Sequence, residues 1–434
     1  MECQLALFSP RPLYGTCIVP GSKSITNRAL VLAALASRMG PCQLHGALAS
    51  EDTEVMVESL IRLGWKISCD WNQGQIAVSR HAESDIPRLI PSSSAELNLA
   101  NSGTSMRFLT AICSLGNGSY KLDGVSRMRE RPLGDLLSSL SSLGIDYDCH
   151  LKSGCPPVTV KSKGWQSEKV RVSGNVSSQF ISGIMLAAPW CGHDMSIAIE
   201  GKMVSEPYVT MTLQMLRQWN VTVEETNDGS FHITHSPNAY RESYSIEPDA
   251  SAASYFWGAA AITGGRLKVK GLTKSSLQGD VGFVDVLGKM GCDILVESDS
   301  ITVSGKAHRG VDVDMNSISD TVMTLAAVAL FANSPTTIRN IGHIRHKETD
   351  RLSAISAELR KIGAVIEETE TSIRIEPGNY HEATLCTYKD HRMAMSLALA
   401  GLRIPGIIIE DPHCVAKTYP GFFKDLEQLV MQNQ

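Results

Sequence analysis

One arrangement recurs six times along this chain of 434 residues. In each copy a short polar segment leads directly into a run of Ala, Leu, Met and other small apolar residues with helical periodicity. A period of about 70–80 residues indicates a duplicated unit that contains strands as well as helices, because the repeats of solenoids are shorter. The copies begin at Ser22, Ser102, Ser177, Asp249, Ser319 and Asp390.

A second kind of helix is expected between these polar starts. It is amphipathic and in most copies ends on an apolar residue followed by Gly, after which short alternating runs predict strand hairpins. The expected segments are Val55–Ile67, Leu136–Asp148, Met211–Val223, Asp285–Glu297, Ile355–Glu368 and Phe422–Val430. The first kind of helix is apolar all round and should lie in a core, whereas the amphipathic kind should cover it. Six units exceed one core, so we predict two α/β domains of three units each, with a boundary near Arg241–Glu247.

Composition narrows the class of protein. Hydrophobic residues at 43% and charged residues at 20% are typical of a globular protein, and a net charge of −5 argues against a general nucleic-acid binder. The eleven cysteines are scattered and form no C-x-x-C, so we expect neither a disulfide framework nor a metal site. The N-terminus lacks the pattern of a signal peptide, and no stretch of about 18 apolar residues predicts a membrane span. We therefore expect a cytoplasmic protein.

The polar helix starts predict binding of anions. A helix N-terminus presents free N–H groups and a partial positive charge, so it favours anions and disfavours cations. Basic side chains nevertheless occur near several of these starts, at Lys23, Arg28, Arg107 and Arg392. A phosphate-bearing ligand explains them most simply, and pairing of a buried arginine with a local carboxylate is the alternative. Ser, Thr and Asp at the same places are more often plain helix caps than ligand contacts.

Two further stretches are rich in charge. Residues Ser126–Leu137 contain three arginines, and residues Ile344–Ala354 alternate basic and acidic side chains at a helix start. In the second stretch Glu348 and Arg351 are i,i+3 neighbours and Lys347 and Arg351 are i,i+4 neighbours. An exposed face with salt bridges is an equally good interpretation of this pattern. Phosphate-binding P-loops, dinucleotide fingerprints and the zinc-protease and serine-hydrolase motifs do not occur.

Ten motifs in order along the chain resemble the 5-enolpyruvylshikimate-3-phosphate (EPSP) synthase family of enolpyruvyl transferases. They cover the chain from end to end, which makes the set far more specific than any single member. The motifs are Pro20–Leu30, Asn101–Leu109, Arg127–Leu136, Ser177–Gly183, Ser205–Tyr208, Asp249–Phe256, Gln278–Leu287, Lys347–Leu352, Asp390–Met395 and Ala416–Phe423.

The resemblance implies a fold that agrees with the repeat count. It is a two-domain inside-out α/β barrel in which each domain has three βαβαββ units. Residues 1–19 and 247–434 would form the C-terminal-type domain, and residues 20–246 the N-terminal-type domain. The active site would lie in the cleft between them.

The resemblance also implies the reaction. The family transfers the enolpyruvyl group of phosphoenolpyruvate to the 5-hydroxyl of shikimate 3-phosphate and releases phosphate, by addition and elimination through a tetrahedral intermediate. This step belongs to the shikimate pathway, which supplies chorismate and the aromatic amino acids, and the family is the target of glyphosate. The resemblance implies no cofactor, no metal, no nucleic-acid partner and a monomer.

The family's residues carry over by motif. Asp320, Glu348 and Lys23 would be catalytic, with Glu348 protonating the methylene carbon and Asp320 accepting the hydroxyl proton. Shikimate 3-phosphate would be bound by Lys23, Ser24, Arg28, Ser177, Ser178, Gln179, Ser205, Asp320 and Lys347. Phosphoenolpyruvate would be bound by Lys23, Gly103, Arg131, Gln179, Arg351, Arg392 and Lys417. Asp52, Thr104, Tyr208, His343 and His391 are weaker candidates.

Two departures from the family pattern concern the site. His343 stands where Asn is usual, which affects one expected substrate contact. Phe108 stands where many members have Pro, and from this we expect an altered response to glyphosate despite Gly103. Three other functions are alternatives to the one that the resemblance implies. A UDP-N-acetylglucosamine enolpyruvyl transferase typically has a reactive Cys in the loop corresponding to Ser126–Arg131, which contains none here. A non-catalytic anion-binding relative would lack the acid–base carboxylates, and an RNA-end-processing enzyme is not supported by the charge balance.

Overall fold

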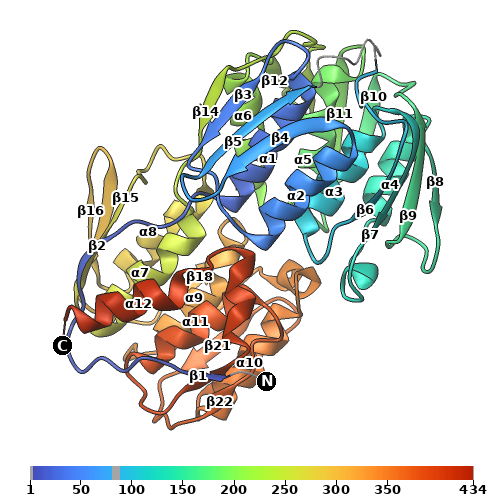
Figure 1. Ribbon diagram of the computed structural model, residues 1–434. Helices are drawn as coiled ribbons and strands as arrows, with labels where there is room; N and C mark the ends of the chain where they lie inside the picture. The colour runs from blue at the N-terminus through green and yellow to red at the C-terminus, as the bar shows by residue number, and fades with distance from the viewer. Residues whose placement is uncertain (1–2, 81–87, 434) are drawn as a thin grey trace. The chain divides into compact units, whose positions relative to one another are not determined.

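The computed structural model describes residues 3–80 and 88–433, which form two compact units (Figure 1). Unit 1 comprises Met1–Pro20 and Glu247–Gln434, and unit 2 comprises Gly21–Ile246. Each unit is built around three helices with strands outside them.

The core of unit 2 consists of α1 (Lys23–Ala36), α3 (Gly103–Cys113) and α5 (Ser178–Ala187), which contact one another. Nearly all of their residues are buried, as the apolar runs predict. Small residues allow the close approach: a Cβ on Gly183 of α5 would lie 3.1 Å from the Arg107 carbonyl oxygen of α3.

Three four-stranded sheets surround this core. Their orders are β14-β3-β5-β4, β6-β7-β9-β8 and β10-β11-β13-β12, and in each the first two strands are parallel and the others antiparallel. The strands are β3 (Cys42–His45), β4 (Trp65–Asp70), β5 (Gln75–Arg80), β6 (Ser94–Asn98), β7 (Asn117–Asp123), β8 (Asp146–Cys149), β9 (Val158–Lys163), β10 (Lys169–Ser173), β11 (Met195–Glu200), β12 (Val223–Glu225), β13 (Phe231–Ile233) and β14 (Ser243–Ser245).

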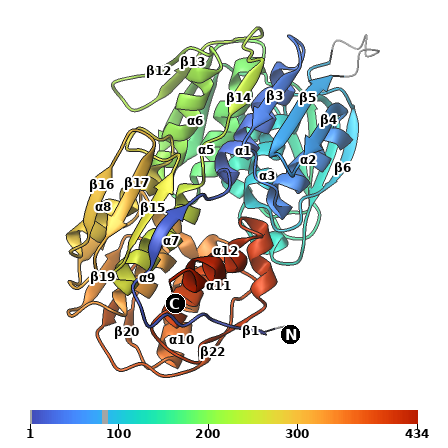
Figure 2. The same cartoon turned by 60° about the vertical axis from the view of Figure 1, so that its left-hand side comes forward.

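Unit 1 repeats this plan around α7 (Ala250–Thr263), α9 (Val322–Ala329) and α11 (His391–Gly401), with β15 and β17 against α7 (Figure 2). Two of its sheets have four strands, in the orders β16-β17-β15-β2 and β18-β19-β21-β20, and the third has the order β1-β23-β22. The strands are β1 (Cys3–Leu5), β2 (Tyr14–Cys17), β15 (Arg266–Lys270), β16 (Asp293–Val296), β17 (Ser300–Ser304), β18 (Asp312–Asp314), β19 (Thr336–Arg339), β20 (Val365–Glu368), β21 (Ile373–Glu376), β22 (Thr384–Leu385) and β23 (Ile408–Glu410).

The order of elements confirms the predicted βαβαββ units. The segment β6-α3-β7-α4-β8-β9 is one unit that is continuous in sequence. Others are completed from distant parts of the chain: β14 pairs with β3 in parallel, β2 pairs with β15 in parallel, and β1 pairs antiparallel with β23. Each of these three strands is an edge strand of its sheet, so the sheets are completed only when distant parts of the chain meet.

Each amphipathic helix overlaps its predicted segment. The helices are α2 (Glu51–Arg62), α4 (Gly134–Ser142), α6 (Glu206–Gln218), α8 (Phe283–Lys289), α10 (Arg351–Lys361) and α12 (Phe422–Met431). Four are shorter than predicted, α6 has the predicted length but begins five residues earlier, and α12 ends one residue later. The first of the four shows why: α2 ends at Arg62, Gly64 adopts a φ of 99°, and β4 begins at Trp65. The predicted segment Val55–Ile67 therefore ran through the turn. Within the described ranges, no helix is long and apolar enough to cross a membrane.

Candidate functional site

The starts of the six core helices are capped as the sequence predicts in four cases. The side chains of Ser102, Ser177, Asp249 and Asp390 each accept a hydrogen bond from a first-turn N–H. Ser22, before α1, makes no side-chain cap, and its buried hydroxyl has no hydrogen-bond partner within the described residues. The sixth start differs: a short 3₁₀ turn, η4 (Ser319–Thr321), precedes α9 and carries Asp320.

In unit 1 the predicted charged residues form one cluster around Arg351. Its Nε lies 2.7 Å from Asp390 Oδ2, its Nη2 lies 2.8 Å from Glu348 Oε2, and its Nη1 lies 3.1 Å from Asp320 Oδ1. Arg351 is 1% exposed, so these ion pairs are shielded from water and from salt screening. The structure thus brings together an arginine from the first turn of α10 with carboxylates from three other segments.

Three more cations border the same carboxylates. Arg392 Nη2 lies 2.8 Å from Asp320 Oδ2, Lys347 Nζ lies 3.8 Å from Asp320 Oδ1, and Lys417 Nζ lies 4.0 Å from Glu348 Oε1. Lys417 belongs to the 3₁₀ turn η6 (Pro412–Lys417), which packs against α11. The four predicted cations of this unit therefore share two predicted acid–base carboxylates, which is the charge arrangement that an anionic reactant and its proton transfers require.

The pKa values in this cluster reflect burial opposed by charge. Burial would lower the pKa of Arg351, but Asp390, Glu348 and Asp320 outweigh it and raise that pKa, so the guanidinium stays charged. Burial lowers the pKa of Lys347, against the opposing effect of Asp320. Burial and then the positive charge of Lys347 lower the pKa of His343 to about 4, so its imidazole is neutral at pH 7.

In the charged stretch at residues 344–354, some side chains form a salt-bridged face and others belong to the cluster around Arg351. Arg345 Nη1 pairs with Asp350 at 2.9 Å and its Nη2 with Glu368 at 2.8 Å, which is the salt-bridged face. Glu348 and Arg351 instead point into the cluster described above. A similar division occurs in unit 2, where Arg127 and Arg129 make exposed ion pairs while the neighbouring Arg131 is buried.

In unit 2 Arg28 is held by uncharged groups. Its Nε donates to Thr212 Oγ1 at 2.8 Å, and its Nη groups donate to the carbonyl oxygens of Ser24 and Tyr208 at 2.9 and 3.0 Å and to Ser182 Oγ at 3.3 Å. Its Cζ lies 5.1 Å from the ring centroid of Phe108, a cation–π distance. Burial lowers the pKa of Arg28 to about 10, which still leaves the side chain charged at neutral pH.

The other predicted residues of unit 2 lie at the same helix starts. Lys23 Nζ, in the first turn of α1, lies 3.2 Å from Asp52 Oδ2 of α2, and both side chains are buried. Gln179 Nε2 donates to Thr104 Oγ1 at 3.2 Å, which joins the first turns of α5 and α3. Ser178 follows the capping residue Ser177 in α5. Lys23 and Thr104 thus each contact another residue of the predicted site.

Gly103 and Arg131 occupy one small space. A Cβ on Gly103 would lie 2.8 Å from Arg131 Cζ, closer than side chains approach one another. Arg131 Nη1 donates to the Asn101 carbonyl oxygen at 3.1 Å, and Arg107 Nη1 donates to the Gly103 carbonyl oxygen at 3.2 Å. The guanidinium of Arg131 therefore lies over the start of α3 because residue 103 has no side chain.

Ser205 is distant in sequence from these residues, and its backbone conformation is unusual. It is buried, precedes α6 and adopts a φ of 52°, a left-handed conformation that is uncommon for Ser. Tyr208, three residues later, offers its carbonyl oxygen to Arg28. His391 is fully buried at the start of α11, with Nδ1 3.7 Å from Asp390 Oδ1.

Sequence reasoning missed three acidic residues of unit 1. The sequence pattern of Asp390 indicates a helix cap and does not show that its carboxylate also binds Arg351. Asp280, in the motif Gln278–Leu287, is buried and accepts a hydrogen bond from Ser251 Oγ. Burial and then the charge of Asp320 raise the pKa of Asp280 to about 6. Glu358 of α10, whose side chain is completely buried, is the third.

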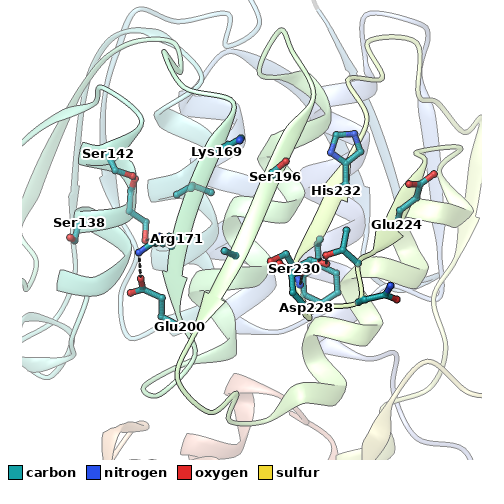
Figure 3. A pocket seen from close by; sticks show the side chains of 16 residues that line it. Ser138, Ser142, Lys169, Arg171, Ser196, Glu200, Glu224, Asp228, Ser230 and His232 are labelled. Atoms are coloured by element: carbon teal, nitrogen blue, oxygen red, sulfur yellow. Dashed lines mark hydrogen bonds and ion pairs between the residues drawn. The ribbon is translucent and has the colours of Figure 1, made fainter.

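Two features of unit 2 do not belong to the predicted site. Cys113 is fully buried in α3, and burial raises the pKa of its thiol, so it cannot serve as the reactive cysteine of a rival enzyme. A groove of about 930 Å³ lies between α4 and the sheet of β10–β13 (Figure 3). It mixes Lys169, Arg171 and His232 with acidic side chains, and Arg171 pairs with Glu200 at 3.5 Å, so it presents no cationic site for phosphates.

Comparisons with known proteins agree on one family. The family model described as EPSP synthase (3-phosphoshikimate 1-carboxyvinyltransferase) matches residues 8–426. A 3-phosphoshikimate 1-carboxyvinyltransferase of Trichormus variabilis is 45% identical over 423 residues, 97% of this chain and 98% of the relative. A chloroplastic one of Arabidopsis thaliana is 42% identical over 98% of this chain and 84% of the relative. The structure of an EPSP synthase from Acinetobacter baumannii superposes with a TM-score of 0.79 at 24% identity, over 99% of this chain and 98% of that one, and it confirms the predicted fold class.

Proposed function

The chain belongs to the EPSP synthase family, and on that premise we propose how its residues transfer the enolpyruvyl group of phosphoenolpyruvate to shikimate 3-phosphate. The observation that carries the proposal is the cluster of unit 1, in which Asp320 and Glu348 contact buried cations. The reaction adds a hydroxyl to C2 of phosphoenolpyruvate while C3 gains a proton, and then expels phosphate while C3 loses one. It therefore needs a carboxylate that acts as both acid and base, close to fixed positive charge.

Within unit 1, Arg351, Arg392 and Lys417 bind the charged groups of phosphoenolpyruvate. Bidentate guanidinium groups suit both a carboxylate and a phosphate. Glu348, which lies 2.8 Å from Arg351 and 4.0 Å from Lys417, protonates the methylene carbon and later removes a proton from it. Asp320 at present accepts hydrogen bonds from Arg351 and Arg392. Incoming anions compete with it for these arginines, and this frees Asp320 to bind the ring hydroxyls and to accept the proton of the 5-hydroxyl.

Within unit 2, Arg28, Lys23, Ser24, Ser177, Ser178, Gln179 and Ser205 bind shikimate 3-phosphate. Support comes from the buried charge of Arg28, whose hydrogen-bond partners among the described residues are uncharged oxygens. Arg131 over Gly103 adds a phosphoenolpyruvate contact. Lys347, Asp52, Thr104, Tyr208, His343 and His391 complete the two sets. A neutral His343 offers both a donor and an acceptor nitrogen, and the usual Asn amide likewise combines donors with an acceptor.

We propose that the two units are the functional domains of the enzyme and that each supplies one of the two residue sets. The support is that several members of each set lie in first turns of helices of their own unit, namely Lys23, Thr104 and Gln179 in α1, α3 and α5, and Arg351 and Arg392 in α10 and α11. Closure around the substrates would exclude water from the tetrahedral intermediate. The side chains supply the charges and proton acceptors of every step without a cofactor. The enzyme works as a monomer in the cytoplasm, where its eleven free cysteines remain reduced.

Phosphate release tests the proposal. The purified protein is incubated with shikimate 3-phosphate and phosphoenolpyruvate, alone and together, beside the variants Glu348→Gln and Glu367→Gln. Glu367 is 73% exposed and serves as the matched control. We expect release only with both substrates, unchanged in the control and lower by about 10²–10⁴-fold in Glu348→Gln.

Each alternative outcome has a separate meaning. Release with UDP-N-acetylglucosamine in place of shikimate 3-phosphate would assign the chain to the other enolpyruvyl transferase. No release with either acceptor would leave an anion-binding protein. Full activity of Glu348→Gln would remove the acid–base role from Glu348 while leaving the reaction in place.

A further inference from the structure

Helix α10 contacts the segment before α11 at two places. Arg351, at the first residue of α10, binds the carboxylate of Asp390 through Nε at 2.7 Å and Nη2 at 3.3 Å. Glu358 lies seven residues later, about two turns along the helix, and therefore on the same face. Its Oε2 accepts from the Cys386 N–H at 2.9 Å, and its Oε1 accepts from the Tyr388 hydroxyl at 2.7 Å. The segment from residue 386 to 390 is thus held at both ends by one helix.

Glu358 is an unusual residue to find in this position. Its side chain is completely buried, and a buried carboxylate is unfavourable unless it is hydrogen-bonded and paired with a cation. Here two donors and the Lys361 Nζ, at 2.7 Å, meet that requirement. Lys361 is 45% exposed, so the pair connects the surface with the buried segment. The mechanism derived above does not use Glu358.

The segment that Glu358 holds has a strained backbone. Tyr388 and Lys389 have φ values of 53° and 56°, two successive non-glycine residues in the left-handed region. Such conformations persist only where surrounding contacts determine them. The Asp390 N–H donates to the Thr387 carbonyl oxygen at 2.8 Å and closes the turn, while Glu358 fixes the Tyr388 side chain. Directly after the turn, Asp390 caps α11 by accepting from the Arg392 N–H at 2.9 Å.

We propose that Glu358 is a positioning residue for phosphoenolpyruvate binding, which it serves by holding the strained turn that places Asp390 and Arg392 at the start of α11. The inference rests on the proposed function, because that function gives Arg392 its ligand. Glu358 touches no substrate. It sets the position of the Arg392 backbone relative to Arg351, so the two arginines reach the same anion.

Steady-state kinetics with both substrates test this role in Glu358→Ala, Glu358→Gln, Tyr388→Phe and the exposed control Glu367→Gln. Loss of a hydrogen-bonded charge should raise the KM for phosphoenolpyruvate by about 10–100-fold in Glu358→Ala. Glu358→Gln keeps one acceptor and should restore about tenfold of that loss. The KM for shikimate 3-phosphate and the control should change by less than about twofold, and kcat by less than the phosphoenolpyruvate KM.

The variants separate positioning from simple stability. Tyr388→Phe removes one hydroxyl from a partly exposed ring, so it should fold and should raise the phosphoenolpyruvate KM by about 2–5-fold. If Glu358→Gln and Tyr388→Phe lower the melting temperature but leave that KM unchanged, the positioning role is wrong while the enzyme assignment stands. A wild-type protein that releases no phosphate would overturn both.

Discussion

The arginines of the two units are held by different kinds of partner. Arg28 in unit 2 donates to hydroxyls and backbone carbonyls, whereas Arg351 in unit 1 contacts Asp320, Glu348 and Asp390. Burial therefore lowers the pKa of Arg28 to about 10 against a smaller opposing effect of Tyr208, while the carboxylates overcome burial at Arg351 and raise its pKa. The two sites are equally buried but differ in how their charge is balanced.

This difference separates two tasks. A cation balanced only by neutral groups has charge to offer an anion without first losing an ion pair, which suits binding. A cation that already holds carboxylates must exchange them for the ligand, but the exchanged carboxylates then stand beside the reacting atoms as acids and bases. We therefore interpret unit 2 as mainly a binding surface and unit 1 as the place of proton transfer.

The largest expected loss of stability comes from replacing Arg351, the cation that three carboxylates share. Arg351→Met leaves Asp390, Glu348 and Asp320 without their common partner, and breaking a buried pair from one side costs about 3–5 kcal/mol. Urea unfolding followed by circular dichroism measures the loss, with the partly exposed Arg374→Met as control. A loss no larger than that of the control would show that the cluster does not depend on Arg351.

The buried carboxyl group of Asp280 in unit 1 should make the free energy of unfolding depend on pH. The pKa of Asp280 is raised from 3.8 to about 6 by burial and then by Asp320, with Asp249 adding to the effect and Arg392 opposing it. The folded state holds this proton more strongly than the unfolded state, so the free energy of unfolding falls as pH rises from about 4 through 6.

Asp280→Asn should remove this fall, which amounts to about 1–3 kcal/mol. Urea unfolding of both proteins from pH 4 to 7 measures the difference between the two slopes. Asn keeps an oxygen that can accept from Ser251, so the contact that Asp280 makes with α7 is retained. Parallel curves for the two proteins would contradict the assignment of this pH dependence to Asp280.

A smaller effect is expected at Arg28, because neutral partners can bond one another when it is gone. Thr212 Oγ1 already lies 3.0 Å from Ser182 Oγ and 2.9 Å from the Tyr208 carbonyl oxygen. Arg28→Met should therefore cost about 1–2 kcal/mol of unfolding free energy, less than Arg351→Met. Binding of shikimate 3-phosphate, measured by calorimetry, should be lost nonetheless. A stability loss as large as that of Arg351→Met would break the comparison.

The smallest expected effect concerns Arg131, the proposed phosphoenolpyruvate contact of unit 2. Gly103→Ala adds a Cβ that would lie 2.8 Å from Arg131 Cζ, so the guanidinium must move. We expect the KM for phosphoenolpyruvate to rise by about tenfold, or 1.4 kcal/mol, with little change for shikimate 3-phosphate. Gly288→Ala, whose new Cβ would meet Ile294 at an ordinary 3.4 Å, is the control. An unchanged KM would place Arg131 outside the phosphoenolpyruvate site.

Several features of the fold could be predicted because they are local. The helical periodicity of residues 23–36 and the cap at Ser102 are properties of short segments, and both occur in the structure. The repeat of these segments predicted six units of strands and helices, and the family resemblance implied their βαβαββ order. The completing strands could not be predicted from pattern alone, because β14 and β3 lie some 200 residues apart in sequence and pair only in the tertiary structure.

The sequence by itself determined the six units, the two kinds of helix and the residue types at each helix start, since periodicity and capping act over a few residues. Only the tertiary structure decided which charges meet. Arg345 and Arg351 lie six residues apart, yet Arg345 is half-buried and pairs with Asp350, whereas Arg351 lies between buried carboxylates. The reason is that the chain turns from a 3₁₀ segment, η5 (Gly342–His346), into α10, and packing fixes the direction of each side chain at that turn. Asp390, 39 residues beyond Arg351, becomes its partner through the packing of α10 against α11.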